Sequence, residues 1–370
     1  MKILILANSD MGLFKFRFEL LEKLAINNEV LFCVPTGDFV PQIVKLGCAF
    51  IPCNVLERRS TNPIKDVRLL SYYKKIILKN KPDIVLTYTI KPNVYGGIIC
   101  QLMKVHYLTN VTGLGTTIEN GGLLANVSMF LYKLGLRKSN CVFFQNKSNQ
   151  HLLMSKGIIK GKTRLIPGSG VNLRKHCFEP YPSDHEKIHF LFVGRLMRDK
   201  GIEELLDAFH AIHKENDKTI LDIVGWCDED YSESLRKAVD AGEAIYYGMQ
   251  NDVHPFYTRC HCAILPSYHE GTANVLLEAS ATGRPVIATR VPGCQETFEE
   301  GVTGYGCDAK SINSLKEAMS CFLATPQEKR EQMGKLARKK MEKEFDRNIV
   351  VRAYFEEIMQ VSEILYKEQK

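Results

Sequence analysis

The hydrophobic positions of the chain form short apolar runs that alternate with longer amphipathic segments. In the first half the apolar runs are rich in β-branched residues, and they predict buried strands at Ile3–Ala7, Val30–Val34, Ile84–Tyr88 and Val142–Phe144. Segments with helical spacing, such as Phe16–Ile26 and Pro63–Lys79, lie between these runs. Strands that alternate with helices in this way are typical of βαβ units, which place the strands in a parallel sheet.

The same alternation begins again in the second half of the chain. Strands are predicted at Phe190–Val193, Ile220–Val224, Ala244–Tyr247, Ala263–Leu265 and Val286–Ala288, and helices at Gly201–Lys214, Asn274–Thr282 and Ser311–Leu323. Between the two sets, Gly168–His185 is rich in Gly, Pro, Asn and Ser, so we interpret it as a linker. The sequence therefore predicts an α/β protein with two Rossmann-like, doubly wound domains, residues 1–170 and 186–347, facing each other across a cleft.

This architecture indicates where ligands bind before any motif is considered. In doubly wound sheets ligands lie beyond the carboxyl ends of the strands, where the N–H groups of the following helices point at them. The loops at those ends are predicted at Asn8–Lys15, Thr87–Tyr95, Asn110–Asn120, Gly194–Gly201, Gly225–Asp230, Gly248–Val253 and Pro266–Asn274.

Composition narrows the class of protein. The 370 residues are 45% hydrophobic and 25% charged, which is typical of a soluble globular chain of two domains. The longest apolar stretches fall well short of the roughly 20 residues that span a bilayer, and the N-terminal run is too short for a signal peptide. Twelve cysteines without paired spacing indicate a reduced, cytoplasmic protein without disulfides.

The charge is distributed unevenly. Residues 1–180 contain 25 Lys and Arg against 10 Asp and Glu, whereas residues 181–370 contain 24 against 32. A basic first half implies an anionic partner such as a phosphate ester, nucleic acid or acidic membrane surface. The most basic segment, from Arg58 to Lys81, has an apolar stripe at helical spacing, so this helix either lies on anionic lipid or covers the sheet.

The segment Pro266–Val286 has the strongest chemical signature. A strand ends at Leu265, a loop then carries Glu270 and Gly271, and a helix begins near Thr272 or Ala273. The first N–H groups of a helix have no internal partner and form an anion site, while a carboxylate can accept two hydrogen bonds from a vicinal diol. Carboxylates on both sides of a phosphate site, here Glu270 and Glu278, suit a nucleotide sugar, one for the transferred sugar and the other for the ribose.

The loop Gly194–Gly201 supplies the complementary charges. Arg195 and Lys200 lie in a loop that opens a helix, where two cations can hold a diphosphate. A nucleoside diphosphate gains negative charge as the glycosidic bond breaks, and fixed cations stabilise that charge.

These two segments, in this order, resemble the family-4 retaining glycosyltransferases of the GT-B fold, and the resemblance extends over nearly the whole chain. It implies that Arg195 and Lys200 bind the donor diphosphate, that Glu270 acts at the transferred sugar and Glu278 at the ribose, and that the C-terminal helix, residues 348–370, crosses back onto the first domain. It also makes the residues that follow Glu270 and the 248–253 loop candidates for substrate binding: Gly271, Thr272, Ala273, Asn274, Met249 and Val253.

The first domain resembles a narrower group. Residues 8–17, 91–96 and 110–116 are similar to transferases that build bacterial capsule, O-antigen or N-glycan intermediates on undecaprenyl diphosphate, such as N-acetylgalactosaminyltransferases of bacterial N-glycosylation. The resemblance implies a donor contact at Gly12 and an anionic acceptor near Arg17 and Lys91. Further binding candidates are Phe16, Asn93, Thr112 and Thr116. Many relatives carry a His in the loop that corresponds to Asn110–Asn120, and this chain has none there.

We therefore expect an enzyme that moves a hexose or N-acetylhexosamine from a UDP-sugar to an undecaprenyl-diphosphate-linked saccharide, at the inner face of the cell membrane. No Asp-x-Asp ends a strand, and fixed cations remove the need for a metal, so we expect no metal or other cofactor. Nucleic acid is disfavoured, because the basic residues do not alternate with aromatic residues. A UDP-sugar 2-epimerase or phosphorylase of the same fold, and a non-catalytic nucleotide-sugar sensor at the membrane, remain open.

Overall fold

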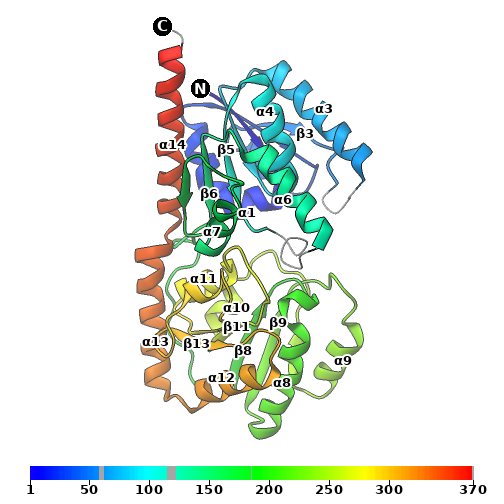
Figure 1. The fold of residues 1–370 in the computed structure, drawn as a ribbon. Coiled ribbons are helices and arrows are strands. Elements are labelled where there is room, and N and C mark those ends of the chain that lie inside the picture. The colour runs from blue at the N-terminus through cyan, green and yellow to red at the C-terminus, as the bar shows by residue number, and fades with distance from the viewer. Residues whose placement is uncertain (58–61, 115–121, 185, 369–370) are drawn as a thin grey trace. The chain divides into compact units, whose positions relative to one another are not determined.

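The protein is described by a computed structural model that covers residues 1–57, 62–114, 122–184 and 186–368. The chain divides into two compact units. Unit 1 comprises Met1–Ser169 and Asn348–Lys370, and unit 2 comprises Gly170–Arg347 (Figure 1).

Unit 1 is built on a seven-stranded parallel sheet. Its strands are β1 (Lys2–Leu6), β2 (Glu29–Val34), β3 (Ala49–Pro52), β4 (Ile84–Tyr88), β5 (His106–Val111), β6 (Cys141–Phe144) and β7 (Thr163–Leu165). Their order in the sheet is β3-β2-β1-β4-β5-β6-β7, and every neighbouring pair is parallel. The strand order reverses its direction between β1 and β4, which is the position where doubly wound sheets bind ligands.

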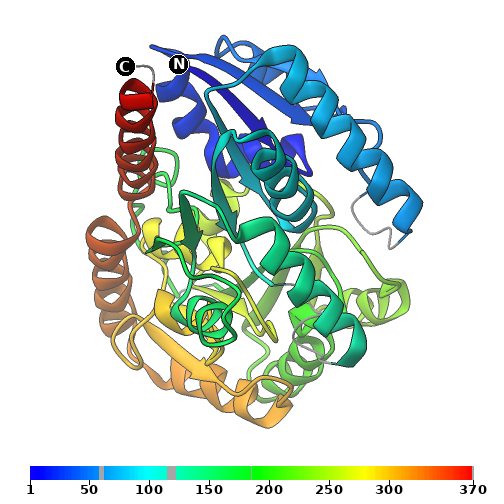
Figure 2. The same cartoon turned by 45° about the horizontal axis from the view of Figure 1, so that its top comes forward.

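Helices cover both faces of this sheet. One face carries α1 (Asp10–Ala25), α2 (Val40–Val44) and α14 (Arg347–Glu368). The other carries α3 (Pro63–Asn80), the π-helical turn η1 (Pro92–Gly96), α4 (Gly97–Met103), α6 (Gly122–Leu136) and α7 (Lys147–Ser155). Both views show α3, α4 and α6 gathered on one face of the sheet (Figures 1 and 2). The basic helix α3 buries Tyr73 and Ile77 in the core, so its stripe covers the sheet, although Val67 is 60% exposed.

Unit 2 repeats the architecture with six strands. These are β8 (Ile188–Val193), β9 (Thr219–Val224), β10 (Ala244–Tyr246), β11 (Cys262–Leu265), β12 (Val286–Thr289) and β13 (Gly304–Cys307), in the order β10-β9-β8-β11-β12-β13 and all parallel. The helices are α8 (Ile202–Glu215), α9 (Ser232–Asp240), α10 (His254–Arg259), α11 (Asn274–Ala281), α12 (Ile312–Ala324) and α13 (Gln327–Lys340), with the short turns η2 (Arg198–Lys200), η3 (Gln295–Thr297) and η4 (Met341–Phe345). Two Rossmann-like parallel-sheet units are thus confirmed.

The structure corrects the sequence analysis in two places. Helix α1 begins at Asp10, where Ser9 caps it by accepting a hydrogen bond from the N–H of Gly12, so most of the predicted loop Asn8–Lys15 is helix. Residues 170–184, interpreted from their composition as part of a linker, belong to unit 2, where Val171 pairs with Asp346 in a parallel bridge. Glycine and proline there mark a segment without regular structure, of which Val171 and His176 are nevertheless buried in unit 2.

None of the helices in the described part of the chain combines the length and the apolarity that a membrane crossing requires.

Candidate functional site

The loops after β8 and β11 lie against each other, because these two strands are neighbours in the sheet of unit 2. The N–H of Tyr268 donates to the carbonyl of Asp199 at 2.9 Å, which ties one loop to the other. Gly201 has a φ of +69°, and a Cβ atom at this position would lie 2.2 Å from the carbonyl oxygen of Pro266. Only glycine permits this conformation and this close approach, which brings Lys200 beside the loop that carries Glu270.

Lys200 and Glu270 meet between these loops. The ammonium group of Lys200 forms a short ion pair with Oε1 of Glu270, and the hydroxyl of Ser267 donates to the same oxygen at 2.9 Å. The two charged side chains are only 19% and 15% exposed. Partial burial and two fixed partners hold the carboxylate and the ammonium in place, as a binding site for a charged ligand requires.

Arg195 is held by a residue that follows β9, the neighbour of β8 on the side opposite β11. Its Nη1 donates to Oδ2 of Asp228 at 2.8 Å, and Asp228 lies in the loop after β9. The backbone between them is fixed, because the N–H of Asp228 donates to the carbonyl of Leu196 at 3.0 Å. The structure therefore places both predicted cations in the loop at the carboxyl end of β8, each paired with a carboxylate from the loop after a neighbouring strand.

The start of α11 forms the third part of this region. Ala273 precedes the helix, no side chain caps it, and the N–H of Ala273 donates to the carbonyl of Gly293 at 2.8 Å. The hydroxyl of Thr272 donates a hydrogen bond to the carbonyl of Gly271 at 3.0 Å. Oδ1 of Asn274 is buried without a hydrogen-bond partner among the described residues. A helix start without a side-chain cap favours a bound anion.

Glu278 lies one turn further along α11, and two residues from elsewhere in unit 2 support its carboxylate. The hydroxyl of Tyr257 donates to Oε2 at 3.1 Å, and Nε2 of His176 lies 3.8 Å from Oε1. Burial lowers the pKa of His176 to about 3, so the imidazole is neutral at physiological pH and its contact with Glu278 is not an ion pair. Sequence reasoning missed both supporting residues, because neither lies near Glu278 in the chain.

Two buried neutral histidines make the stability of unit 2 depend on pH. Burial lowers the pKa of His176 to about 3 and that of His261 to about 4, from the usual 6.5. Below about pH 6.5 the unfolded chain binds protons at these positions and the folded chain does not. The free energy of unfolding therefore falls with decreasing pH by about 1.4 kcal/mol per pH unit for each histidine.

Chemical denaturation between about pH 7 and about pH 5 tests this dependence. The variants His176→Gln and His261→Asn should each have a shallower pH slope than the original chain, whereas His151→Gln, at an exposed position, should keep the original slope. An unchanged slope in both buried-site variants would contradict the assignment.

The remaining candidates in unit 2 lie between β10 and α10. Met249 is 52% exposed in the loop after β10. Val253 immediately precedes α10 and packs against the core of the unit. Their roles in binding stay predictions.

In unit 1, the candidates on α1 differ in exposure. Gly12 lies in the first turn, while Phe16 is partly buried one turn later. Arg17 is only 4% exposed, with its guanidinium carbon 5.2 Å from the centre of the Tyr88 ring, and its Nη1 donates to the carbonyl of Phe16 at 2.8 Å. Arg17 is thus packed into the unit, and a contact with an anionic acceptor stays a prediction.

The candidates after β4 and β5 are also held by neighbours. Lys91 pairs with Asp66 at 2.8 Å, and the amide nitrogen of the fully buried Asn93 donates to the carbonyl of Asn110 at 2.7 Å. Thr112 is partly buried just beyond β5. Thr116 lies outside the described residues.

Comparison with known proteins agrees with this arrangement. Residues 174–340 match the model of the family "Glycosyl transferases group 1", and residues 2–146 match "Glycosyl transferase 4-like". A Campylobacter jejuni protein named N,N'-diacetylbacillosaminyl-diphospho-undecaprenol alpha-1,3-N-acetylgalactosaminyltransferase is 26% identical over 87% of this chain and 89% of its own. The capsular polysaccharide biosynthesis glycosyltransferase CapM of Staphylococcus aureus is 26% identical over 76% of this chain and 78% of its own.

Solved structures share the fold. Sucrose-phosphate synthase from Thermosynechococcus elongatus superposes with a TM-score of 0.79 at 20% identity, over 98% of this chain and all of that one. Anabaena HepE, solved with UDP and glucose, gives a TM-score of 0.79 at 17% identity, over 97% of this chain and all of that one. The group 1 model matches most of unit 2 and the 4-like model matches most of unit 1, and the chain is therefore a glycosyltransferase built from these two kinds of domain, with the GT-B fold.

Proposed function

We propose that this glycosyltransferase moves a hexose or N-acetylhexosamine from a UDP-sugar to an undecaprenyl-diphosphate-linked saccharide, with retention of configuration, at the cytoplasmic face of the membrane. The observation that carries the proposal is the meeting of Lys200 and Glu270 in the loops after β8 and β11, just before the start of α11, with Arg195 on the same loop as Lys200. The lipid-linked substrate in the name of the Campylobacter relative supports the acceptor class.

The charges of this site match the needs of the leaving group. As the glycosidic bond breaks, electrons stay on the diphosphate oxygen, and Arg195 and Lys200 stabilise the charge that develops there. An ammonium group carries three N–H donors, so Lys200 can keep its bond to Glu270 and still donate to a phosphate oxygen. The pairs with Asp228 and Glu270 hold both cations ready, so little reorganisation is needed when the donor binds.

The carboxylates have separate roles in this proposal. Glu270 binds hydroxyls of the transferred sugar, and Glu278, supported by Tyr257, accepts hydrogen bonds from the two ribose hydroxyls. The acceptor hydroxyl attacks on the face from which the diphosphate departs, and a departing phosphate oxygen takes its proton. No step in this sequence requires a metal ion or another cofactor.

The membrane contact is assigned to unit 1. This unit contains 26 Lys and Arg against 13 Asp and Glu. Along α6 a row of large apolar side chains is exposed, comprising Leu124 (65%), Val127 (48%), Phe130 (59%) and Leu134 (39%). Their spacing of three or four residues places them on one side of the helix, and the exposed Lys133, Arg137 and Lys138 adjoin them. An apolar helix face beside cations suits an anionic lipid surface.

One experiment tests both parts of the proposal. A panel of nucleotide sugars is screened by thermal shift, and the donor that stabilises the protein is then supplied with an undecaprenyl-diphosphate-linked saccharide in vesicles. We expect sugar transfer in anionic vesicles, slower transfer in zwitterionic ones, and an anomeric product of unchanged configuration. Binding of nucleotide sugar without transfer to any lipid-linked saccharide would contradict the proposal.

A double variant in the same vesicles separates membrane contact from chemistry. Val127→Ser combined with Phe130→Ser should weaken vesicle binding by at least about tenfold, because each buried large side chain contributes about 1.5–3 kcal/mol. Val239→Ser with Ile312→Ser, at exposed apolar positions of unit 2, is the matched control and should bind normally. Equal binding of both double variants would exclude α6 as the membrane surface.

A further inference from the structure

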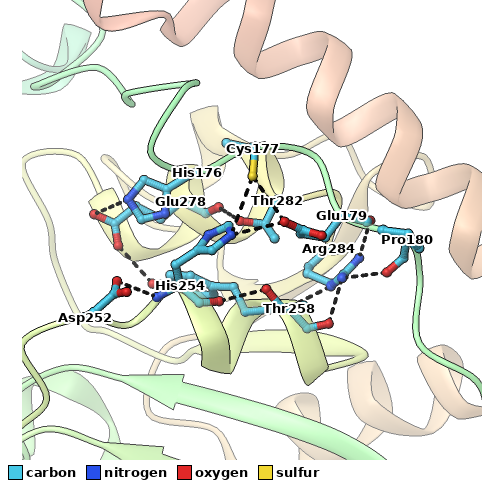
Figure 3. Close-up of polar contacts among 12 residues, drawn as sticks. His176, Cys177, Glu179, Pro180, Asp252, His254, Thr258, Glu278, Thr282 and Arg284 are labelled. Atoms are coloured by element: carbon cyan, nitrogen blue, oxygen red, sulfur yellow. Dashed lines mark hydrogen bonds and ion pairs between the residues drawn. The ribbon is translucent and has the colours of Figure 1, made fainter.

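Three side chains that can bind a metal ion meet in unit 2, although they are distant in the sequence. Cys177 and Glu179 lie in the segment before β8, and His254 is the first residue of α10 (Figure 3). Sγ of Cys177 lies 3.1 Å from Oε1 of Glu179 and 3.7 Å from Nε2 of His254, and the last two atoms are 3.4 Å apart.

These distances have the proportions of a tetrahedral zinc site. With bonds of about 2.0–2.3 Å from zinc to sulfur, nitrogen and oxygen, neighbouring ligand atoms at tetrahedral angles lie about 3.4–3.6 Å apart. The three separations bracket this range, so an ion can enter with shifts of a few tenths of an ångström. A thiolate, an imidazole and a carboxylate together favour Zn²⁺ over the hard cations Mg²⁺ and Ca²⁺, which prefer oxygen ligands.

A buried arginine fixes the two segments that carry these ligands. Arg284 is fully buried, and its guanidinium donates to the carbonyls of Glu179 and Pro180 on one side and to those of Tyr257 and Thr258 on the other (Figure 3). The N–H of Glu179 also donates to the carbonyl of Thr282 at 3.1 Å. The ligands are therefore held on a fixed frame, as metal sites require.

The same two segments support Glu278. His176, next to Cys177 in the chain, approaches Oε1 of this carboxylate, and Tyr257, three residues after His254 on α10, donates to Oε2. An ion that joins Cys177 to His254 therefore links the two supports of the carboxylate.

We propose that Cys177, Glu179 and His254 form a zinc site, with the fourth position open to water, and that a bound ion stiffens the support of Glu278 and so tightens the binding of the nucleotide. The second part rests on the proposed function, which assigns Glu278 to the ribose. Cys177 is exposed, while Glu179 and His254 are 28% and 19% exposed at their side chains, so an ion can reach the site from solvent. Binding converts the thiol to a thiolate and releases its proton to solvent.

Titration with Co²⁺ tests the site without any enzyme assay. An untagged, chelator-treated chain should bind Co²⁺ with a thiolate-to-cobalt charge-transfer band that saturates at one ion per chain and is bleached by Zn²⁺. Cys177→Ser should abolish the band, and Glu179→Gln and His254→Gln should each weaken Co²⁺ binding by at least about tenfold. Cys321→Ser and His151→Gln, at exposed positions elsewhere, should leave the band unchanged.

The absence of a band in the original chain, or its persistence in Cys177→Ser, would overturn the site. Thermal melting of the metal-free variants is the check that they are folded. The variants remove only exposed or partly exposed groups, so their melting temperatures should match that of the original chain.

The link to Glu278 is tested by titrating UDP with and without one equivalent of Zn²⁺. We expect at least about threefold tighter binding with zinc in the original chain and no change in Cys177→Ser. If the chain shows the cobalt band but binds UDP equally well with and without zinc, the metal site is supported and its effect on Glu278 is rejected. A cobalt band in a chain that binds no nucleotide would reject the proposed function and leave the metal site intact.

Discussion

Replacing Arg195 or Lys200 by alanine should lower the turnover number by about 10²–10³-fold while the fold stays intact. This is the loss that follows removal of one fixed donor to a developing oxyanion. Both cations lie on the loop after β8, where Arg195 pairs with Asp228 and Lys200 pairs with Glu270 in the loop that leads to α11. Their charge matters most in the transition state, when the diphosphate becomes a leaving group, so kcat should fall more than donor affinity.

The same loop provides the control for this prediction. Arg198 is exposed, and the loop is anchored there by its backbone N–H, which donates to Glu229 at 2.8 Å. Arg198→Ala therefore removes one positive charge from the loop but leaves Arg195 and Lys200 in place, and we expect a nearly normal kcat. The test compares the initial rates of the three variants and the original chain with the donor identified by thermal shift, and their melting temperatures show whether each variant is folded. Near-normal rates in both Arg195→Ala and Lys200→Ala would remove the leaving-group assignment.

Most of the buried strands could be predicted from the sequence because they are largely apolar runs. The edge strands β3, β7 and β13 were missed, since they are three or four residues long and β13 contains two glycines. The start of α1 was also missed, because its first turn carries Asp10 and Gly12, which weaken the helical pattern. The local sequence alone does not show that Ser9 caps this turn; the hydrogen bond is seen only in the folded structure.

The candidate site divides in a similar way. Arg195, Lys200, Glu270 and Glu278 could be predicted as candidates because loops at strand ends, and the helices that follow them, can be located from the pattern of strands. The groups that hold them were not found, since support comes from distant parts of the chain. Tyr257 lies 21 residues from Glu278. Cys177 and His254, which form the proposed zinc site, are 77 residues apart and only the folded sheet brings them together.

Replacing Arg284 by methionine should destabilise unit 2 by about 3–5 kcal/mol and lower its melting temperature by about 10 °C. Its side chain is fully buried and burial lowers the pKa of its guanidinium, but hydrogen bonds to carbonyl oxygens compensate for the lost hydration. Methionine fills much of the volume but leaves the carbonyls of Pro180 and Thr258 without this donor. Each buried acceptor that loses its partner costs about 1–3 kcal/mol.

A second substitution and an exposed control separate this effect from a general loss of charge. Arg284→Lys keeps the charge, but one ammonium group cannot reach carbonyls on both segments as the planar guanidinium does, so most of the destabilisation should remain. Arg290→Met removes an arginine that is 48% exposed and paired with Glu300 and Asp308, and should change stability by no more than about 1 kcal/mol. If Arg284→Met has the same melting temperature as Arg290→Met, the guanidinium of Arg284 does not hold α10 to the 179–180 segment. If the melting temperature of Arg284→Met is much lower than that of Arg290→Met, Arg284→Met should also bind Co²⁺ at Cys177 more weakly, because the same hydrogen bonds position the ligands.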